Sequence, residues 1–200
     1  MKYKRFNDYA GWAVWLVATI VYLLTIEPTA SFWDCGEFIA SAYKLEVGHP
    51  PGAPMFMLIA RLFAMFVPAV YAATAVNVMS AMASSFTILF LFWSITHLAQ
   101  KLSMTRWTEG QTEPTSAQRL AILGSGAVGA LAYTFSDSFW FSAVEGEVYA
   151  LSSLFTALVF WAILKWESRA EEPGNLRWIV LIAYLMLSLI HISEPTRPPE

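Results

Sequence analysis

The sequence predicts an all-α integral membrane protein with about five transmembrane helices and one further helix on the membrane surface. Of its 200 residues, 57% are hydrophobic and only 14% are charged, whereas soluble domains carry about 25% charged residues. Several segments are apolar for long enough to cross the ~30 Å hydrocarbon core of a bilayer as helices. The loops between them alternate between basic and non-basic, which gives the crossings an orientation.

The first predicted span covers residues 10–26. Basic residues precede it, which places the N-terminus in the cytoplasm; they are Lys2, Lys4 and Arg5. A signal peptide has the same order of a basic start and an apolar run. The length of the run, its Trp12 and Trp15 and the later spans favour a retained anchor.

The apolar stretch 62–100 is too long for one helix, and Pro68 divides it. The basic loops 101–119 and 165–177 both face the cytoplasm if they follow the positive-inside rule. Only one crossing can then lie between residues 53 and 100. We therefore expect an amphipathic helix over 53–67 on the outer membrane surface.

The remaining spans follow from the same alternation. They are expected at about 73–99, 119–136, 148–165 and 177–190. Residues 27–72, with the surface helix, and the loop 137–147 then face the outer side.

Inside the third predicted span, Gly124-Ser-Gly126-Ala-Val-Gly129 matches the letters of a dinucleotide-binding loop. No strand precedes it, so the dinucleotide interpretation fails its structural context. Ser125 and Gly129 instead have the spacing of small residues that let two helices pack closely.

The first outer segment contains Ser31-Phe-Trp-Asp-Cys-Gly-Glu37. If a helix starts at Phe32, Asp34 and Glu37 share one face. Such a pair can take a proton from a hydroxyl, bind a divalent cation or orient a polar acceptor. Alternatively, Ser31 and Asp34 have the spacing of a capping box, which would make Asp34 a structural acid in the first helical turn. Both roles are compatible.

Other polar residues near this pair also have a structural and a functional interpretation. His49 precedes two prolines, so it is extended, and it is either structural or a polar contact of the site. Lys44 and Arg61 could meet a lipid phosphate or extend towards headgroups. Cys35 is expected to be a packing residue, and as the only cysteine it excludes an internal disulfide.

The second outer loop carries Asp137, Glu145 and Glu147. A glutamate at the start of a helix can simply complement the helix dipole. Because this loop is predicted to face the same side as Asp34, Glu145 and Glu147 are also candidates for the same pocket. His97, near the cytoplasmic end of a span, is expected to be interfacial.

The last residues, 188–200, interrupt the fifth span with polar residues and prolines. They resemble a translated sequencing adapter, so we expect them to be non-native and assign His191 no role. The chain is then expected to be an N-terminal fragment, with residues 1–187 as the native part.

Three motifs carry a family resemblance: Phe32-Trp-Asp-Cys-Gly-Glu-Phe38, Gly48-His-Pro-Pro-Gly-Ala-Pro54 and Phe139-Trp-Phe-Ser-Ala-Val-Glu-Gly-Glu-Val-Tyr-Ala150. They resemble a large bacterial family of membrane proteins related to a eukaryotic transmembrane O-mannosyltransferase. More distantly, the layout is similar to GT-C glycosyltransferases. The resemblance covers about residues 6–187, and it implies a GT-C-like helical bundle in the bacterial inner membrane, with its active-site loops in the periplasm.

The resemblance also implies a reaction. A mannose-like sugar would pass from a polyprenyl-phosphate donor to a hydroxyl of a protein or glycan acceptor. Asp34 would be the general base, and Glu37 would support it or orient the acceptor. Glu145 or Glu147 would supply the second acid of the pocket, with His49 nearby. In the distant relatives the two acids are often adjacent, whereas here two residues separate them, which leaves their division of roles open. The isolated fragment is expected to be inactive.

Two other classes compete with a glycosyltransferase: a transporter and a non-catalytic membrane assembly protein. A transporter predicts ionisable residues near the bilayer midplane, and these spans contain almost none. The sequence calls for no cofactor and assigns no metal ligand, although a divalent cation is compatible with the acid pair. No basic block indicates nucleic acid.

Overall fold

The computed structural model describes residues 2–49, 52–105, 107 and 110–192, and the ordered elements in this part of the chain are all helices. The predicted all-α fold is therefore confirmed. The helices are α1 (Lys2–Leu24), α2 (Cys35–Lys44), α3 (Pro54–Ala64), α4 (Ala72–Met104), α5 (Ser116–Thr134), α6 (Asp137–Val144), α7 (Val148–Glu167) and α8 (Leu176–Ile190), with a 3₁₀ turn η1 (Ala69–Tyr71) before α4.

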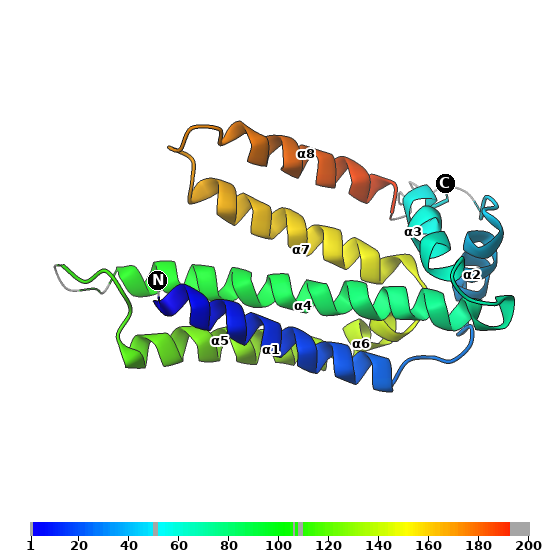
Figure 1. The fold of residues 1–200 in the computed structure, drawn as a ribbon, viewed down its shortest axis with the longest axis horizontal. Coiled ribbons are helices and arrows are strands. Elements are labelled where there is room, and N and C mark those ends of the chain that lie inside the picture. The colour runs from blue at the N-terminus through cyan, green and yellow to red at the C-terminus, as the bar shows by residue number, and fades with distance from the viewer. Residues whose placement is uncertain (1, 50–51, 106, 108–109, 193–200) are drawn as a thin grey trace, which may run out of the picture.

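Helix α4 forms the centre of the bundle and packs against α1, α5 and α7, while α8 lies against α7 (Figure 1). Small side chains make the close approach of α5 possible. A Cβ at Gly126 would lie 2.5 Å from Thr96 Cγ2, and one at Gly129 would lie 2.8 Å from Ile95 Cδ1. The helix-packing interpretation of this motif is confirmed, with Gly126 taking the contact that we had assigned to Ser125.

Among the described residues, two helical segments are long and apolar enough to cross a membrane, Ala69–Met104 and Val148–Glu167. Helices α5 and α6, bent by 66° at their junction, qualify together as a third. Helices also occupy the other predicted ranges, as α1 and α8, but the count of five crossings stays a prediction.

Two boundaries differ from the sequence analysis. Helix α5 starts at Ser116 because Thr115 and Gln118 form a capping box ahead of the apolar run. Residues 137–147 were predicted to be a loop, but α6 occupies Asp137–Val144. Two residues separate this helix from the end of α5, and the chain bends by 66° between them.

The connections fall into two groups at opposite ends of the bundle (Figure 1). Helices α2 and α3 and the turn from α6 to α7 lie at one end, which we call the acidic end. The α4–α5 and α7–α8 connections lie at the other end with the start of α1, which we call the basic end. This arrangement follows the predicted alternation of loops, and the membrane orientation itself stays a prediction.

Helix α3 falls within the segment predicted to lie on the membrane surface, and that location also stays a prediction. Of the segment expected to be non-native, residues 188–190 complete α8. Residues 193–200 lie outside the described residues.

Candidate active site at the acidic end

The first acid-bearing segment enters α2 through a sharp turn. Trp33 has a left-handed backbone, with φ of 67°, and Asp34 is the residue that precedes the first helical turn. The Asp34 side chain makes no capping hydrogen bond and is exposed. The helix therefore starts at Cys35 instead of Phe32, and the capping-box prediction is wrong. The physical reason is that the Ser31 hydroxyl donates to Glu145.

Glu37, in the first turn of α2, is held by the segment that follows the helix. The backbone N–H of His49 donates to Glu37 Oε1 over 2.5 Å, and His49 Nδ1 lies 3.0 Å from Glu37 Oε2. These contacts lower the pKa of Glu37, first through the backbone hydrogen bond and then through the imidazole. Glu37 is thus kept as a carboxylate beside Asp34.

Gly48 makes this contact possible because a side chain there would crowd the carboxylate. A Cβ on Gly48 would lie 3.2 Å from Glu37 Oε1 and 3.5 Å from Met57 Cε. His49 also packs its ring 6.1 Å from that of Phe38, a buried residue of α2. The loop after α2 is therefore folded back onto the helix face that carries Glu37.

Asp34, Glu37 and His49 form a cluster in which one ligand atom from each residue lies within 4.8 Å of the others. Two carboxylates and an imidazole are ligands that suit divalent cations such as Mn²⁺ or Zn²⁺. The cluster is accessible, since both acids are exposed and His49 is half-buried. This arrangement can hold a cation or share a proton.

The second acid-bearing segment, Glu145-Gly-Glu147, connects α6 to α7 and is buried, with Glu145 3% and Glu147 8% exposed. Burial raises the pKa of Glu145, although the Ser31 hydroxyl opposes this shift. The structure thus brings this segment into contact with the one that carries Asp34.

Gly146 lets the second segment lie directly on α4 and α2. A Cβ there would meet Asn77 Oδ1 and Val76 Cγ1 at 2.9 Å and Ile39 Cγ1 at 3.3 Å. Asn77, fully buried, also donates to the backbone oxygens of Glu27, at 2.6 Å, and Thr29, at 2.9 Å. One amide of α4 therefore contacts the second acid-bearing segment and the stretch of chain that leads into the first.

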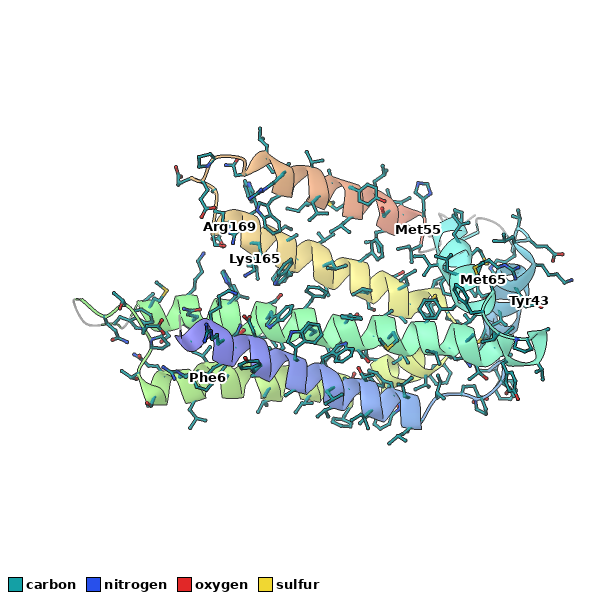
Figure 2. All side chains as sticks on the ribbon, in the orientation of Figure 1. Phe6, Tyr43, Met55, Met65, Lys165 and Arg169 are labelled. Atoms are coloured by element: carbon teal, nitrogen blue, oxygen red, sulfur yellow. The ribbon has the colours of Figure 1, made fainter. Side chains whose placement is uncertain are left out.

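The two basic candidates have structural partners. Arg61 in α3 donates to the Tyr43 carbonyl oxygen and lies 5.3 Å from the centroid of the Tyr43 ring, so it fastens α3 to the end of α2. Tyr43 and Met65 are labelled at this end in Figure 2. Lys44 is exposed and lies 3.7 Å from Glu46. Cys35 is fully buried, as expected for a packing residue.

Sequence reasoning missed Ser31, Gly48, Gly146 and Asn77 as parts of this site. Three of them stand inside or beside the quoted motifs, and the glycines next to Glu145, Glu147 and His49 were the available signal. Asn77 had none, because a single asparagine in an apolar run has no distinguishing pattern.

The chain is similar to proteins of one known family. The family model described as the Protein O-mannosyl-transferase TMEM260 N-terminal domain matches residues 34–190. Among curated proteins, the chain is 26% identical over 167 residues to Protein O-mannosyl-transferase tmem260 of Dictyostelium discoideum, covering 82% of this chain and 18% of that protein. It is 28% identical over 169 residues to Protein O-mannosyl-transferase TMEM260 of Mus musculus, covering 82% of this chain and 21% of that protein.

The chain thus spans about a fifth of the length of these relatives. No solved structure matches it. The family match begins at Asp34, includes both acid-bearing segments and ends with α8. From this match over most of its length, the chain belongs to the family of the Protein O-mannosyl-transferase TMEM260 N-terminal domain.

Proposed function

We propose that this chain supplies the catalytic loops of a membrane glycosyltransferase that moves a mannose-like sugar from a polyprenyl-phosphate donor to an acceptor hydroxyl. One observation carries the proposal. The Asp34 carboxylate is exposed and has no hydrogen bond or ion pair with any described residue. It stands beside a Glu37 that is fixed by His49. A general base needs this combination of access and fixed neighbours.

In the proposed reaction, Asp34 takes the proton of the acceptor hydroxyl. The acceptor oxygen attacks the anomeric carbon, the bond between that carbon and the phosphate oxygen breaks, and lipid phosphate leaves with the electron pair. Attack from the face opposite the phosphate inverts the anomeric centre. Glu37, held by two contacts from His49, orients the acceptor or supports Asp34.

The buried acids have a different part in this proposal. Burial raises the pKa of Glu145, so this carboxyl holds its proton to a higher pH than an exposed glutamate does. Through Ser31 it is coupled to the turn that leads into Asp34. In this proposal Glu145 and Glu147 are the buried acids of the site, linked to the first acid-bearing segment through Ser31.

A divalent cation fits the same cluster. It would be held by Asp34, Glu37 and a neutral His49, and it would neutralise charge on the phosphate as the sugar departs. Asp34 would then serve as a ligand instead of a free base. Chelator treatment of the active protein separates the two versions, because only the metal version loses activity and regains it with added Mn²⁺.

Replacing Asp34 by Asn in the complete gene product tests the proposal. Transfer from a polyprenyl-phosphate sugar should fall by about 10²–10⁴-fold, the usual contribution of a general base, with an unchanged melting temperature. Asp137→Asn, an exposed acid at the same end of the bundle, is the matched control and should keep its activity. Undiminished transfer by folded Asp34→Asn would overturn the proposed base.

A transporter or an assembly protein would give a different pattern. In that case the parent protein would show no sugar transfer from any polyprenyl-phosphate donor, and Asp34→Asn would alter substrate flux or complex formation instead. Sugar transfer by the parent protein therefore decides between the enzyme and its competitors before any variant is made.

A further inference from the structure

A polar cavity lies at the basic end of the bundle, far from the acidic end. It has a volume of about 450 Å³, whereas a single water needs only roughly 10–15 Å³ of such space. Three helices and one loop form its walls. Lys165 and Phe6, labelled in Figure 2, mark this end of α7 and α1. The lining residues used below are Tyr3, Asn7, His97, Glu113, Trp161 and Lys165.

The lining comes in pairs of residues four apart, each pair on one helix. Helix α1 supplies Tyr3 and Asn7, and α7 supplies Trp161 and Lys165; α4 supplies Trp93 and His97. Residues four apart lie on the same helical face, so each helix turns one face to the cavity. The walls are held together by α4, which packs against both α1 and α7.

Four polar atoms of this lining are buried and have no hydrogen-bond partner among the described residues: Tyr3 Oη, Asn7 Oδ1, Trp93 Nε1 and His97 Nε2. Tyr3 as a whole is only 6% exposed. Buried polar atoms in folded proteins are nearly always paired, so a group of unpaired atoms around one cavity indicates a missing partner. These atoms come from two different helices, which makes a single local distortion a poor explanation.

The charges show which kind of partner is missing. Lys4 lies 3.3 Å from Asp8, and Glu113 accepts from the backbone N–H of Tyr3 at 3.3 Å. Both carboxylates of the lining are thus engaged. Lys165 pairs with no described carboxylate, and its ammonium lies 5.4 Å from the centroid of the Trp161 ring. Lys165 is thus the ammonium of the described lining that has no carboxylate partner.

The neutral groups match the same ligand. Tyr3 donates a hydroxyl proton, and His97 Nε2 donates in one neutral tautomer and in the charged form. The Asn7 amide can present its NH₂ in place of its oxygen after rotation. Together with Lys165, these groups form a set of donors around a space that a phosphate and its substituent can fill.

We propose that this cavity binds a phosphate group, with Lys165 as the cationic anchor and Tyr3 and His97 as hydrogen-bond donors. The phosphate comes either from a phospholipid headgroup or from a soluble phosphate compound. The site is separate from the acidic cluster and from the proposed transfer reaction.

The test uses the full chain, purified and delipidated in detergent. In one arm inorganic phosphate is titrated in by calorimetry. In the other, phosphatidylglycerol is added and retained lipid is counted by native mass spectrometry, with a phosphate-free galactolipid as the negative control. Binding of phosphate in the first arm assigns a soluble source, and binding of phosphatidylglycerol alone assigns a headgroup.

Two variants locate the site. Lys165→Met, which keeps the length of the side chain, should weaken binding about tenfold, since a charge-assisted hydrogen bond is lost. Tyr3→Phe should weaken it several-fold, and it keeps the test valid if Lys165→Met fails to fold. Lys101→Gln is the control, because Lys101 lies near this end, pairs with Glu167 at 2.5 Å and does not line the cavity.

Each outcome of these measurements either supports the phosphate site or overturns it. Saturable binding that both variants weaken and the control leaves within twofold supports the site. No binding of either probe to the parent chain overturns it, and so does binding that Tyr3→Phe and Lys165→Met leave unchanged. At saturating concentrations of the probe, a Tyr3→Phe variant that melts higher than the parent would show that the hydroxyl has no partner even then, which is a third way to reject the proposal.

Discussion

At the acidic end the polar groups come from connections between helices, whereas at the basic end they come from the helices themselves. Asp34, His49 and Glu145 lie outside helical segments or at their edges. Tyr3, His97 and Lys165 lie within helices. A connecting segment can bring its side chains to a substrate at small cost, and binding and catalytic residues are often found on such segments. Side chains fixed on packed helices favour a site of constant shape.

The two ends also differ in the surroundings of their charged side chains. At the acidic end, Glu37 is exposed and has a lowered pKa, while Glu145 is buried and has a raised pKa. At the basic end, Lys4 and Lys101 each have a carboxylate partner. Pairs of carboxyl groups whose environments shift their pKa values in opposite directions are typical of acid–base chemistry. The comparison therefore favours chemistry at the acidic end and binding at the basic end.

The largest expected effect on stability comes from Gly146→Ala. Its Cβ would lie 2.9 Å from Asn77 Oδ1 and Val76 Cγ1, so the α6–α7 turn must move off α4. We expect a loss of about 1–3 kcal/mol of unfolding free energy, the usual cost of overpacking, measured by thermal or denaturant unfolding in detergent.

Gly124→Ala is the matched control, because a Cβ at Gly124 meets nothing within 4 Å. In the middle of α5 it should add up to about 1 kcal/mol through helix propensity. Equal stability of the two variants would show that the buried acid-bearing turn is not held against α4 as described.

The next effect concerns His49→Ala in the complete gene product. Loss of the imidazole contact leaves Glu37 with only the backbone hydrogen bond, so its carboxylate is less well positioned. We expect kcat to fall about tenfold, in line with a hydrogen bond to a charged group, with KM for the donor nearly constant. A change in KM alone would instead assign His49 to donor binding.

The sequence predicted the helices well because long apolar runs determine them locally. It also predicted that the segments with Asp34 and Glu145 would lie at one end, from the alternation of basic loops. It failed at Ser31 because the capping interpretation considered residues three positions apart, while the actual partner, Glu145, lies 114 positions away.

The basic-end cavity had no sequence signal of this kind. His97 was expected to be interfacial, and Tyr3 and Lys165 lie more than 150 positions apart in the sequence. Each is unremarkable in its own segment. Only the packing of α1, α4 and α7 brings them together, and a pattern within one helix cannot reveal it.

A smaller effect is expected in the pH dependence of stability. The folded-state pKa of Glu145 is raised, so its contribution is fully present below the unfolded value near 4.5 and declines as pH rises through the folded value. Glu145→Gln should therefore melt higher than the parent at pH 7 and at about the same temperature at pH 4.

The contribution of Glu37 to stability depends on pH in the opposite sense. Its lowered pKa contributes stability above the unfolded value, and this is lost as pH falls through the folded value. Glu37→Gln should accordingly melt slightly lower than the parent at pH 7 and show no difference at low pH. If both variants moved in the same direction at pH 7, the assigned environments of the two acids would be wrong.

The smallest effect on stability separates the two basic residues of the acidic end. Lys44 is exposed and only 3.7 Å from Glu46, so Lys44→Gln should change the unfolding free energy by less than about 0.5 kcal/mol. Arg61→Gln should cost about 1 kcal/mol, because it removes the hydrogen bond to the Tyr43 carbonyl and the contact with the Tyr43 ring.

For binding of the donor, the Lys44 variant should show the larger effect and the Arg61 variant the smaller one. The ammonium of Lys44 remains accessible to a lipid phosphate, whereas the guanidinium of Arg61 already contacts Tyr43 at the end of α2. A higher KM for the polyprenyl-phosphate donor in Lys44→Gln, with unchanged melting, would therefore assign Lys44 to donor recognition. The same KM in both variants would remove both residues from the donor site and leave the acids and His49 as its polar groups.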